Sequence, residues 1–190
     1  MSRGLLLTST FYGTWLPGDR RGFVGRVRDA RADDSVTPSR VVHDQHGTPY
    51  DRALPGLHRA SAERLRDEPV YLDATEADVL LKQFSETATF RNWRLLAAAV
   101  MANHVHLVVV VRDLDDPTKV LGDFKAYGSR ALTARFGKHA SGTWWTYGGS
   151  KRRLPDDRAV RAAVNYVVRK QHAPLATYEA EPEQVHERSE

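Results

Sequence analysis

Residues 93–111 read Trp-Arg-Leu-Leu-Ala-Ala-Ala-Val-Met-Ala-Asn-His-Val-His-Leu-Val-Val-Val-Val and contain two apolar segments separated by Ala102-Asn103. The two-residue break between these aliphatic segments predicts a β-hairpin with a tight turn. Side chains alternate between the two faces of a strand, so His104 and His106 are expected on one face. Two neutral imidazoles on one face can hold a divalent metal, although either ring can also be a half-buried side chain with one hydrogen bond.

The composition limits the classes of protein to which this chain can belong. Its 190 residues fit one domain, since domains usually contain about 100 to 200 residues. The chain has no cysteine, which excludes disulfides, zinc-thiolate sites and a cysteine nucleophile. No apolar run approaches the roughly 18 residues that cross a bilayer. We therefore expect a soluble, cytoplasmic protein without a membrane partner.

Charge is distributed unevenly along the chain. The formal net charge is +4, but residues 179–190 hold five Glu against one Arg, a local charge of −4 that leaves +8 for the rest. A basic body favours a phosphate-rich partner such as nucleic acid, although many basic proteins bind none.

Other segments show the periodicity and caps of regular structure. Asp73 with Glu76 forms a capping box, Asp116-Pro117 is a cap followed by a proline at the first helical position, and Asp156 is a third cap. The predicted elements beside the hairpin are strands at 5–12 and 144–154 and helices at about 74–91, 117–136 and 157–171. This order predicts an α+β fold, the ferredoxin-like split β-α-β arrangement: an antiparallel sheet with helices on one face and an added C-terminal helix.

The domain boundaries follow from the same pattern. Residues 1–178 are expected to form a single domain, with a long loop insertion at about 14–69 where proline, glycine and alternating charges interrupt any periodicity. The acidic segment 179–190 is expected to be a disordered tail.

The last predicted helix carries an unexpected polar residue. A helical projection places Val160, Ala163, Val164 and Val167 on one apolar stripe, with Tyr166 on its flank. Gln171 falls in the middle of this stripe, where a buried amide needs a partner such as a metal or a backbone group. If the helix ends earlier, Gln171 is simply solvated.

These residues carry a family resemblance. The segment Met101-Ala102-Asn103-His104-Val105-His106 resembles the Met-Pro-Asn-His-Val-His signature of the HUH single-tyrosine transposases, in particular the REP-associated tyrosine transposases. The segment 164–168 resembles their helix with the nucleophilic tyrosine, and the segments 11–19 and 145–154 are also similar. The similarity covers most of residues 4–176.

The resemblance implies a metal-dependent single-stranded DNA endonuclease and strand transferase, and with it a nucleoid-associated protein. By matching position, His104 and His106 become ligands of Mg²⁺ or Mn²⁺, and Tyr166 becomes the nucleophile that forms a 5′-phosphotyrosine. Relatives commonly carry a polar ligand four residues after the tyrosine, where this chain has Lys170, a poor ligand when protonated. We therefore expect Gln171 as the third ligand and Lys170 as a phosphate contact.

Cationic side chains beside aromatic rings favour binding of single-stranded DNA, because bases stack on aromatic side chains while phosphates contact Lys and Arg. The basic run at 151–153 follows two tryptophans and a tyrosine, although core packing explains these rings as well. The expected nucleic-acid-binding residues are Lys151, Arg152, Arg153, Lys170, Trp145, Arg20 and Arg21.

Two other functions remain open from the sequence. One is a module that binds hairpin DNA but has lost strand transfer, which the lysine at position 170 favours. The other is a two-histidine phosphoesterase, which needs a second histidine pair that this sequence does not contain. Both a monomer and a homodimer with shared active sites are compatible with the sequence.

Overall fold

The centre of the protein is a five-stranded antiparallel sheet with the strand order β4-β1-β3-β2-β5. The structure is a computed structural model that describes residues 2–20 and 53–181. Its elements are β1 Ser2–Thr10, α1 Pro55–Glu63, α2 Ala74–Phe90, β2 Arg94–Val100, β3 His104–Arg112, α3 Pro117–Phe136, β4 Ser150–Leu154, α4 Asp157–Arg169 and β5 Ala176–Glu179.

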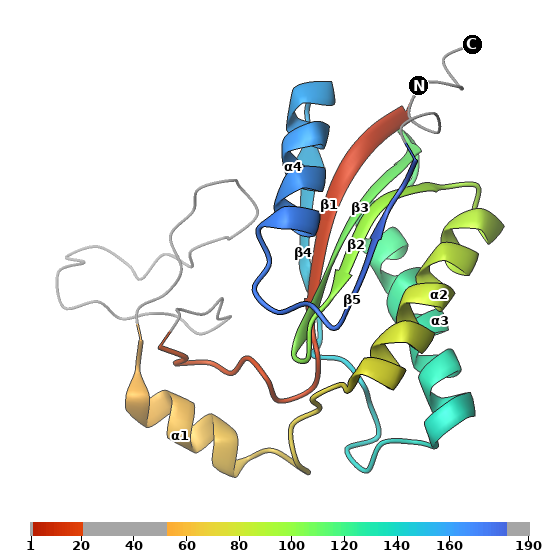
Figure 1. The fold of residues 1–190 in the computed structure, drawn as a ribbon. Coiled ribbons are helices and arrows are strands. Elements are labelled where there is room, and N and C mark those ends of the chain that lie inside the picture. Colours follow the sequence, from red (N-terminus) through yellow and green to blue (C-terminus); the bar gives the residue numbers. More distant parts are fainter. Residues whose placement is uncertain (1, 21–52, 182–190) are drawn as a thin grey trace, which may run out of the picture.

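The first four strands have the order of the split β-α-β arrangement, so the predicted ferredoxin-like α+β fold is confirmed. Helices α2 and α3 cover one face of the sheet, and the added helix α4 lies on the other (Figure 1). The sheet is therefore covered on both faces, with a separate apolar cluster under each helical layer.

The predicted caps determine where the helices begin. The Asp73 side chain accepts a hydrogen bond from the Glu76 backbone N–H while the Glu76 carboxylate accepts one from Asp73, which completes the capping box of α2. Asp116 and Asp156 cap α3 and α4 with their side chains alone, which accept hydrogen bonds from the backbone N–H groups of Thr118 and Ala159. The three predicted helix starts are confirmed.

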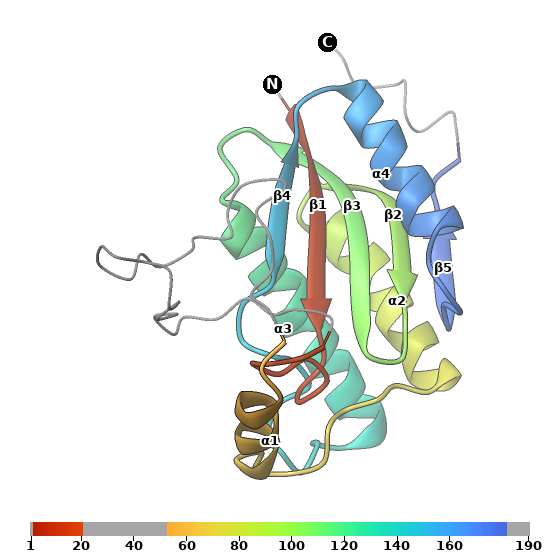
Figure 2. The ribbon, with the colours of Figure 1, turned by 90° about the vertical axis from the view of Figure 1, so that its left-hand side faces the viewer.

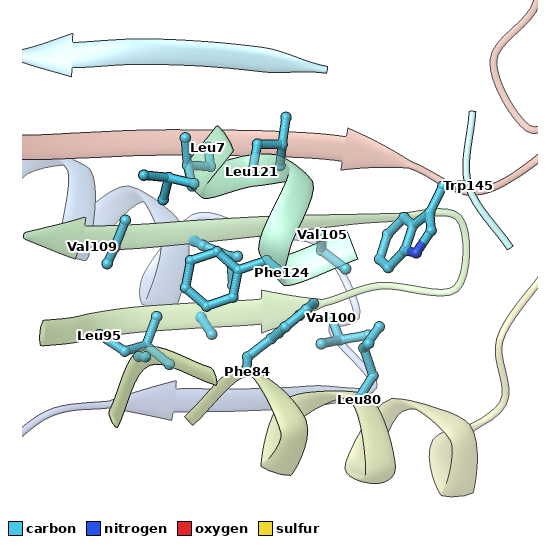
Figure 3. Packing of buried hydrophobic residues seen from close by; sticks show 14 of the residues in the cluster. Leu7, Leu80, Phe84, Leu95, Val100, Val105, Val109, Leu121, Phe124 and Trp145 are labelled. Carbon is cyan, nitrogen blue, oxygen red and sulfur yellow. The ribbon is translucent and has the colours of Figure 1, made fainter. Parts of the chain in front are cut away.

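The larger core lies between the sheet and the helices α2 and α3. Phe84 of α2 and Phe124 of α3 meet edge to face with ring centroids 5.7 Å apart, over aliphatic side chains of the hairpin strands (Figure 3). Odd-numbered residues of β3, such as Val105 and Val109, point into this core. The even-numbered residues, including both histidines, therefore face α4.

Helix α4 crosses its face of the sheet diagonally. Near its start, Val160 packs over β1 at Gly4, where an added Cβ would lie only 2.7 Å from Val160 Cγ2. At its end, Arg169 forms a 2.9 Å ion pair with Glu179 of β5. The ends of β4, β1 and β3 that lie on the same side as the turn of the β2–β3 hairpin are consequently not covered by α4 (Figure 2).

Three sequence expectations need correction. The strand expected over 144–154 is confined to Ser150–Leu154, with one isolated bridge between Phe11 and Trp145 before it. The insertion at 14–69 is not loop throughout, because it contains α1. A fifth strand, β5, pairs with β2 and extends through Glu179, so the sheet reaches into the segment expected to be a disordered tail.

In the described part of the chain, no helix is both long enough and apolar enough to span a membrane.

Candidate metal and tyrosine site

His104 and His106 lie at the start of β3, at the end of the sheet that α4 leaves uncovered. Their ring centroids are 4.9 Å apart, with the planes at 85°. His104 pairs with Thr10 of β1, and His106 pairs with Thr8. The predicted same-face placement of the two imidazoles agrees with this geometry, whereas their role as metal ligands stays a prediction.

His106 is a neutral base held in one orientation. It is only 7% exposed, and its Nδ1 lies 2.7 Å from the Thr8 hydroxyl oxygen. Burial, followed by the nearby His104, lowers the pKa of His106 from 6.5 to about 4. At neutral pH the ring therefore carries a lone pair rather than a positive charge, as a metal ligand requires.

His104 is oriented by its neighbour in the chain. Its Nδ1 lies 2.6 Å from Oδ1 of Asn103, an oxygen that can only accept a hydrogen bond. Because Oδ1 of Asn103 accepts, the neutral form of the His104 ring carries its proton on Nδ1. Its lone pair is then on Nε2. Metal-binding histidines usually have their second nitrogen bonded in this way, so the contacts of both rings fit a divalent metal.

Tyr166 extends from the third turn of α4 onto the ring of His106. The two ring centroids are 5.4 Å apart with an interplanar angle of 66°, and the tyrosine is 43% exposed. The helical projection placed Tyr166 on the flank of the buried stripe, and the structure agrees. A phenol beside a buried neutral imidazole, accessible from one side, can meet a substrate that contacts both.

Gln171 lies just beyond α4, which ends at Arg169. Its Nε2 donates a 3.0 Å hydrogen bond to the backbone carbonyl of Tyr166, and the Lys170 backbone N–H donates to the same carbonyl. Gln171 is therefore not on the helical stripe as projected, but its amide is attached to the turn that holds the tyrosine. Within residues 2–20 and 53–181, no three His, Asp or Glu side chains gather into a metal site.

The basic run at 151–153 lies on β4, an edge strand. Arg152 pairs with Leu6 on the face that carries His106, whereas Lys151 and Arg153 pair with Leu7 and Leu5 on the opposite face. Only one of the three predicted contacts therefore points to the same side of the sheet as the histidines.

Lys125 of α3 fixes the loop before β4. Its ammonium donates to the carbonyls of Thr146 at 2.6 Å and Gly148 at 2.8 Å. Burial, followed by the positive charge of Lys151, lowers the pKa of Lys125 to about 8. These contacts hold the start of the basic strand at a defined position.

Trp145 was expected to stack on DNA bases, and this expectation is wrong. Its side chain is 6% exposed, its ring stacks on Phe11 with centroids 4.7 Å apart, and its Nε1 donates to the Lys125 carbonyl. Trp145 is a core residue. Arg20 and Lys170 are exposed, and Arg21 lies outside the described residues.

The sequence did not identify Thr8 and Asn103 as supporting residues. The sequence could have indicated a supporting role for Asn103, because this residue directly precedes His104 in the turn. It could not have indicated one for Thr8, because the contact of Thr8 with His106 joins residues 98 positions apart.

Comparisons with known proteins agree with the sequence resemblance. Residues 65–150 match the family described as Transposase IS200 like; this segment contains both histidines and ends before α4. No curated protein matches the chain. Over this segment, the family match supports the resemblance to a transposase group that the sequence shows.

Two solved structures are similar to the chain. One is a REP-associated tyrosine transposase bound to a REP hairpin, with 12% identity, a TM-score of 0.44, and coverage of 87% of this chain and 64% of that one. The other is a candidate transposase from Deinococcus radiodurans, with 17% identity, a TM-score of 0.44, and coverage of 91% and 93%. The chain thus spans less than two thirds of the first structure.

Proposed function

Because residues 65–150 carry the sequence pattern of the IS200-like transposases, we propose that this protein cleaves and rejoins single-stranded DNA at hairpins through a covalent bond to Tyr166. The family match itself supports a transposase-like role in DNA processing. The observation that carries the finer proposal is the contact of Tyr166 with His106, whose ring centroids are 5.4 Å apart.

His104, His106 and the amide oxygen of Gln171 are the proposed ligands of Mg²⁺ or Mn²⁺. When bound, such an ion polarises the scissile phosphate and offsets the negative charge that develops on it. Asn103 and Thr8 would hold the two rings so that each presents its other nitrogen. The low pKa of His106, about 4, keeps this ring available without competition from a proton at neutral pH.

Tyr166 supplies the nucleophile. Its phenol loses a proton, its oxygen forms a bond to phosphorus, and the bond between phosphorus and the 3′ oxygen breaks, so the leaving strand takes up a proton as a free 3′-OH. The 5′ phosphate stays attached to Tyr166. Because one phosphate ester replaces another, a second 3′-OH can reverse the step and join two strands without ATP.

The DNA partner would lie at the end of the sheet that α4 leaves uncovered, on the face that carries His106. Arg152 lies on that face, and Lys170 and Arg20 are exposed, so these three side chains can contact phosphates without reading the sequence. Lys151 and Arg153 point to the opposite face and would contact only a strand that passes around the edge of β4. The proposed site takes both histidines and Tyr166 from one chain, in which their rings lie together.

A second function is a hairpin-binding module of the same fold without strand transfer. The lysine at position 170 favours it, as does the lack of a third His, Asp or Glu ligand among the described residues. Such a module would bind hairpin DNA and give no covalent product.

The test is incubation with hairpin-bearing single-stranded DNA and Mn²⁺, followed by a denaturing gel. We expect a denaturation-resistant adduct with the native chain and none with Tyr166→Phe. His106→Ala should lose cleavage and keep most of the DNA binding, whereas Tyr127→Phe, on a different helix, should still form the adduct. Binding without adduct under every metal would support the module instead.

A further inference from the structure

An open cavity of about 740 Å³ lies beside the hairpin turn that carries the histidines. Its walls come from the loop at 14–20, from α1 and from Tyr71, and Asn103 of the turn also lines it. Since Oδ1 of Asn103 accepts the hydrogen bond of the His104 ring, this cavity shares a wall with the proposed metal site. A volume in this range suits a small ligand.

Tyr71 is presented to this cavity by its buried neighbours. The backbone N–H of Val70 donates to the Tyr12 carbonyl, and that of Leu72 donates to the Ala102 carbonyl in the hairpin turn, each at 2.8 Å. Val70 and Leu72 are buried at 3% and 4% exposure, whereas Tyr71 between them is 62% exposed. The chain therefore fixes the backbone on both sides of an aromatic ring that faces outward.

A second part of the cavity wall is also fixed by the backbone. Gly18 has a positive φ of 86°, and an added Cβ would lie 2.4 Å from the Leu54 carbonyl oxygen and 2.5 Å from the His58 nitrogen. The Leu54 backbone N–H donates to the Gly18 carbonyl at 3.1 Å. The loop at 14–20 and the start of α1 thus meet closely, and a larger residue at position 18 would separate them.

Cationic side chains line the same cavity. Arg20 and Arg59 are exposed lining residues, and His58 is half-buried among them. Asp19 also lines the cavity but is buried at 6% exposure. An exposed aromatic ring with two guanidinium groups is the combination that binds a single-stranded nucleotide, because the base stacks on the ring while the phosphate meets the cations.

We propose that this cavity binds one unpaired DNA nucleotide next to the scissile phosphate, with its base on Tyr71 and its phosphate at Arg59 and Arg20. The inference rests on the proposed function, from which it takes single-stranded DNA as the ligand. It assigns Tyr71, Arg59 and Arg20 to positioning the strand beside the histidines and not to the reaction itself.

The test uses hairpin DNA with single-stranded flanks, in which 2-aminopurine replaces each unpaired base in turn. Tyr166→Phe protein in the presence of Mg²⁺ serves as the background, so that no cleavage interferes. We expect the fluorescence to fall about twofold or more at one position on binding, as stacking on an aromatic ring requires. Tyr71→Ala should remove this quenching and weaken binding about tenfold, whereas Tyr71→Phe should retain both.

The charges are tested by a matched pair of arginines. Arg59→Gln should lower the slope of log affinity against log salt by about one, the effect of one lost phosphate contact. Arg64→Gln, at the end of α1 and outside the cavity lining, should leave the slope unchanged.

Quenching that persists in Tyr71→Ala, or equal slopes for the two arginine variants, would overturn the cavity assignment. Its failure can be distinguished from failure of the proposed function, because binding and quenching are measured without an adduct. Tyr71-dependent quenching together with no adduct from the native chain would uphold the cavity and reject strand transfer. An adduct from the native chain together with quenching that does not depend on Tyr71 would uphold strand transfer and reject the cavity assignment.

Discussion

The ring of Tyr166 packs edge-on against the ring of His106, with centroids 5.4 Å apart. The two residues are brought together by the path of α4, which is in close contact with β1 at Gly4 and is paired with β5 through Arg169. The partners of α4 in these two contacts, Gly4 and Glu179, are distant from the tyrosine in sequence and do not belong to the proposed chemistry. The juxtaposition therefore depends on how α4 crosses the sheet.

The low pKa of His106 predicts that the protein loses stability in mild acid. The unfolded chain takes up this proton below about pH 6.5 and the folded chain only below about pH 4, so the unfolded state holds more protons in between. The free energy of unfolding should fall by up to about 3 kcal/mol as the pH drops through this window. Urea unfolding at several pH values, in the presence of a chelator, measures this fall.

His106→Gln is the control for this prediction, because glutamine does not titrate. The variant should show a shallower dependence of unfolding free energy on pH between about 4 and 6.5. An identical pH dependence in both proteins would mean that another group is responsible.

Thr8 should affect metal affinity although it is not a proposed ligand. Its hydroxyl lies 2.7 Å from Nδ1 of His106, and loss of such a supporting contact typically weakens metal binding about 10- to 100-fold. Thr8→Val removes the hydroxyl with little change in shape, and Thr8→Ser keeps it. Calorimetric titration with Mn²⁺ should give weaker binding for valine and near-native binding for serine. Native affinity in Thr8→Val would remove Thr8 from the site.

Two adjacent arginines should differ in their effect on DNA binding. Arg152 lies on the face of His106 and Arg153 on the opposite face, and both are exposed. Arg152→Ala should weaken binding to hairpin DNA and lower the salt slope by about one. Arg153→Ala, its matched control, should have the smaller effect in the same fluorescence-anisotropy titration. A larger loss with Arg153→Ala would place the DNA on the side of α3.

Gln171 has a structural contact that must be separated from its proposed role as a ligand. Gln171→Ala removes both the hydrogen bond to the Tyr166 carbonyl and the amide oxygen, whereas Gln171→Glu removes the donor and keeps an oxygen. If the oxygen binds the metal, Mn²⁺ affinity should fall in the alanine variant and persist or rise in the glutamate variant. Equal affinity of the native chain and Gln171→Ala would leave the metal with two protein ligands.

The strongest sequence predictions came from local patterns. The hairpin, the three aspartate caps and the placement of both histidines on one face follow from alternation and capping within about ten residues, and the structure agrees with each. The position of Tyr166 on the flank of the buried stripe likewise follows from helical periodicity.

Other features depend on contacts that no local pattern encodes. Trp145 lies in the core because it meets Phe11 and Lys125, distant in sequence, although the adjacent basic run made it look like part of a binding surface. β5 is four residues long and gives too little alternation to be recognised. The α1 helix has no buried residue, and so it carries no apolar stripe that could predict it.

The most direct test of the central claim is identification of the residue that becomes attached to DNA. The native chain would be incubated with Mn²⁺ and a hairpin substrate, digested, and analysed by mass spectrometry for a nucleotide-bearing peptide. We predict a phosphotyrosine at Tyr166, absent after His106→Ala. Attachment at Tyr127 or Tyr178, or a DNA-bound protein with no modified tyrosine, would contradict the proposal.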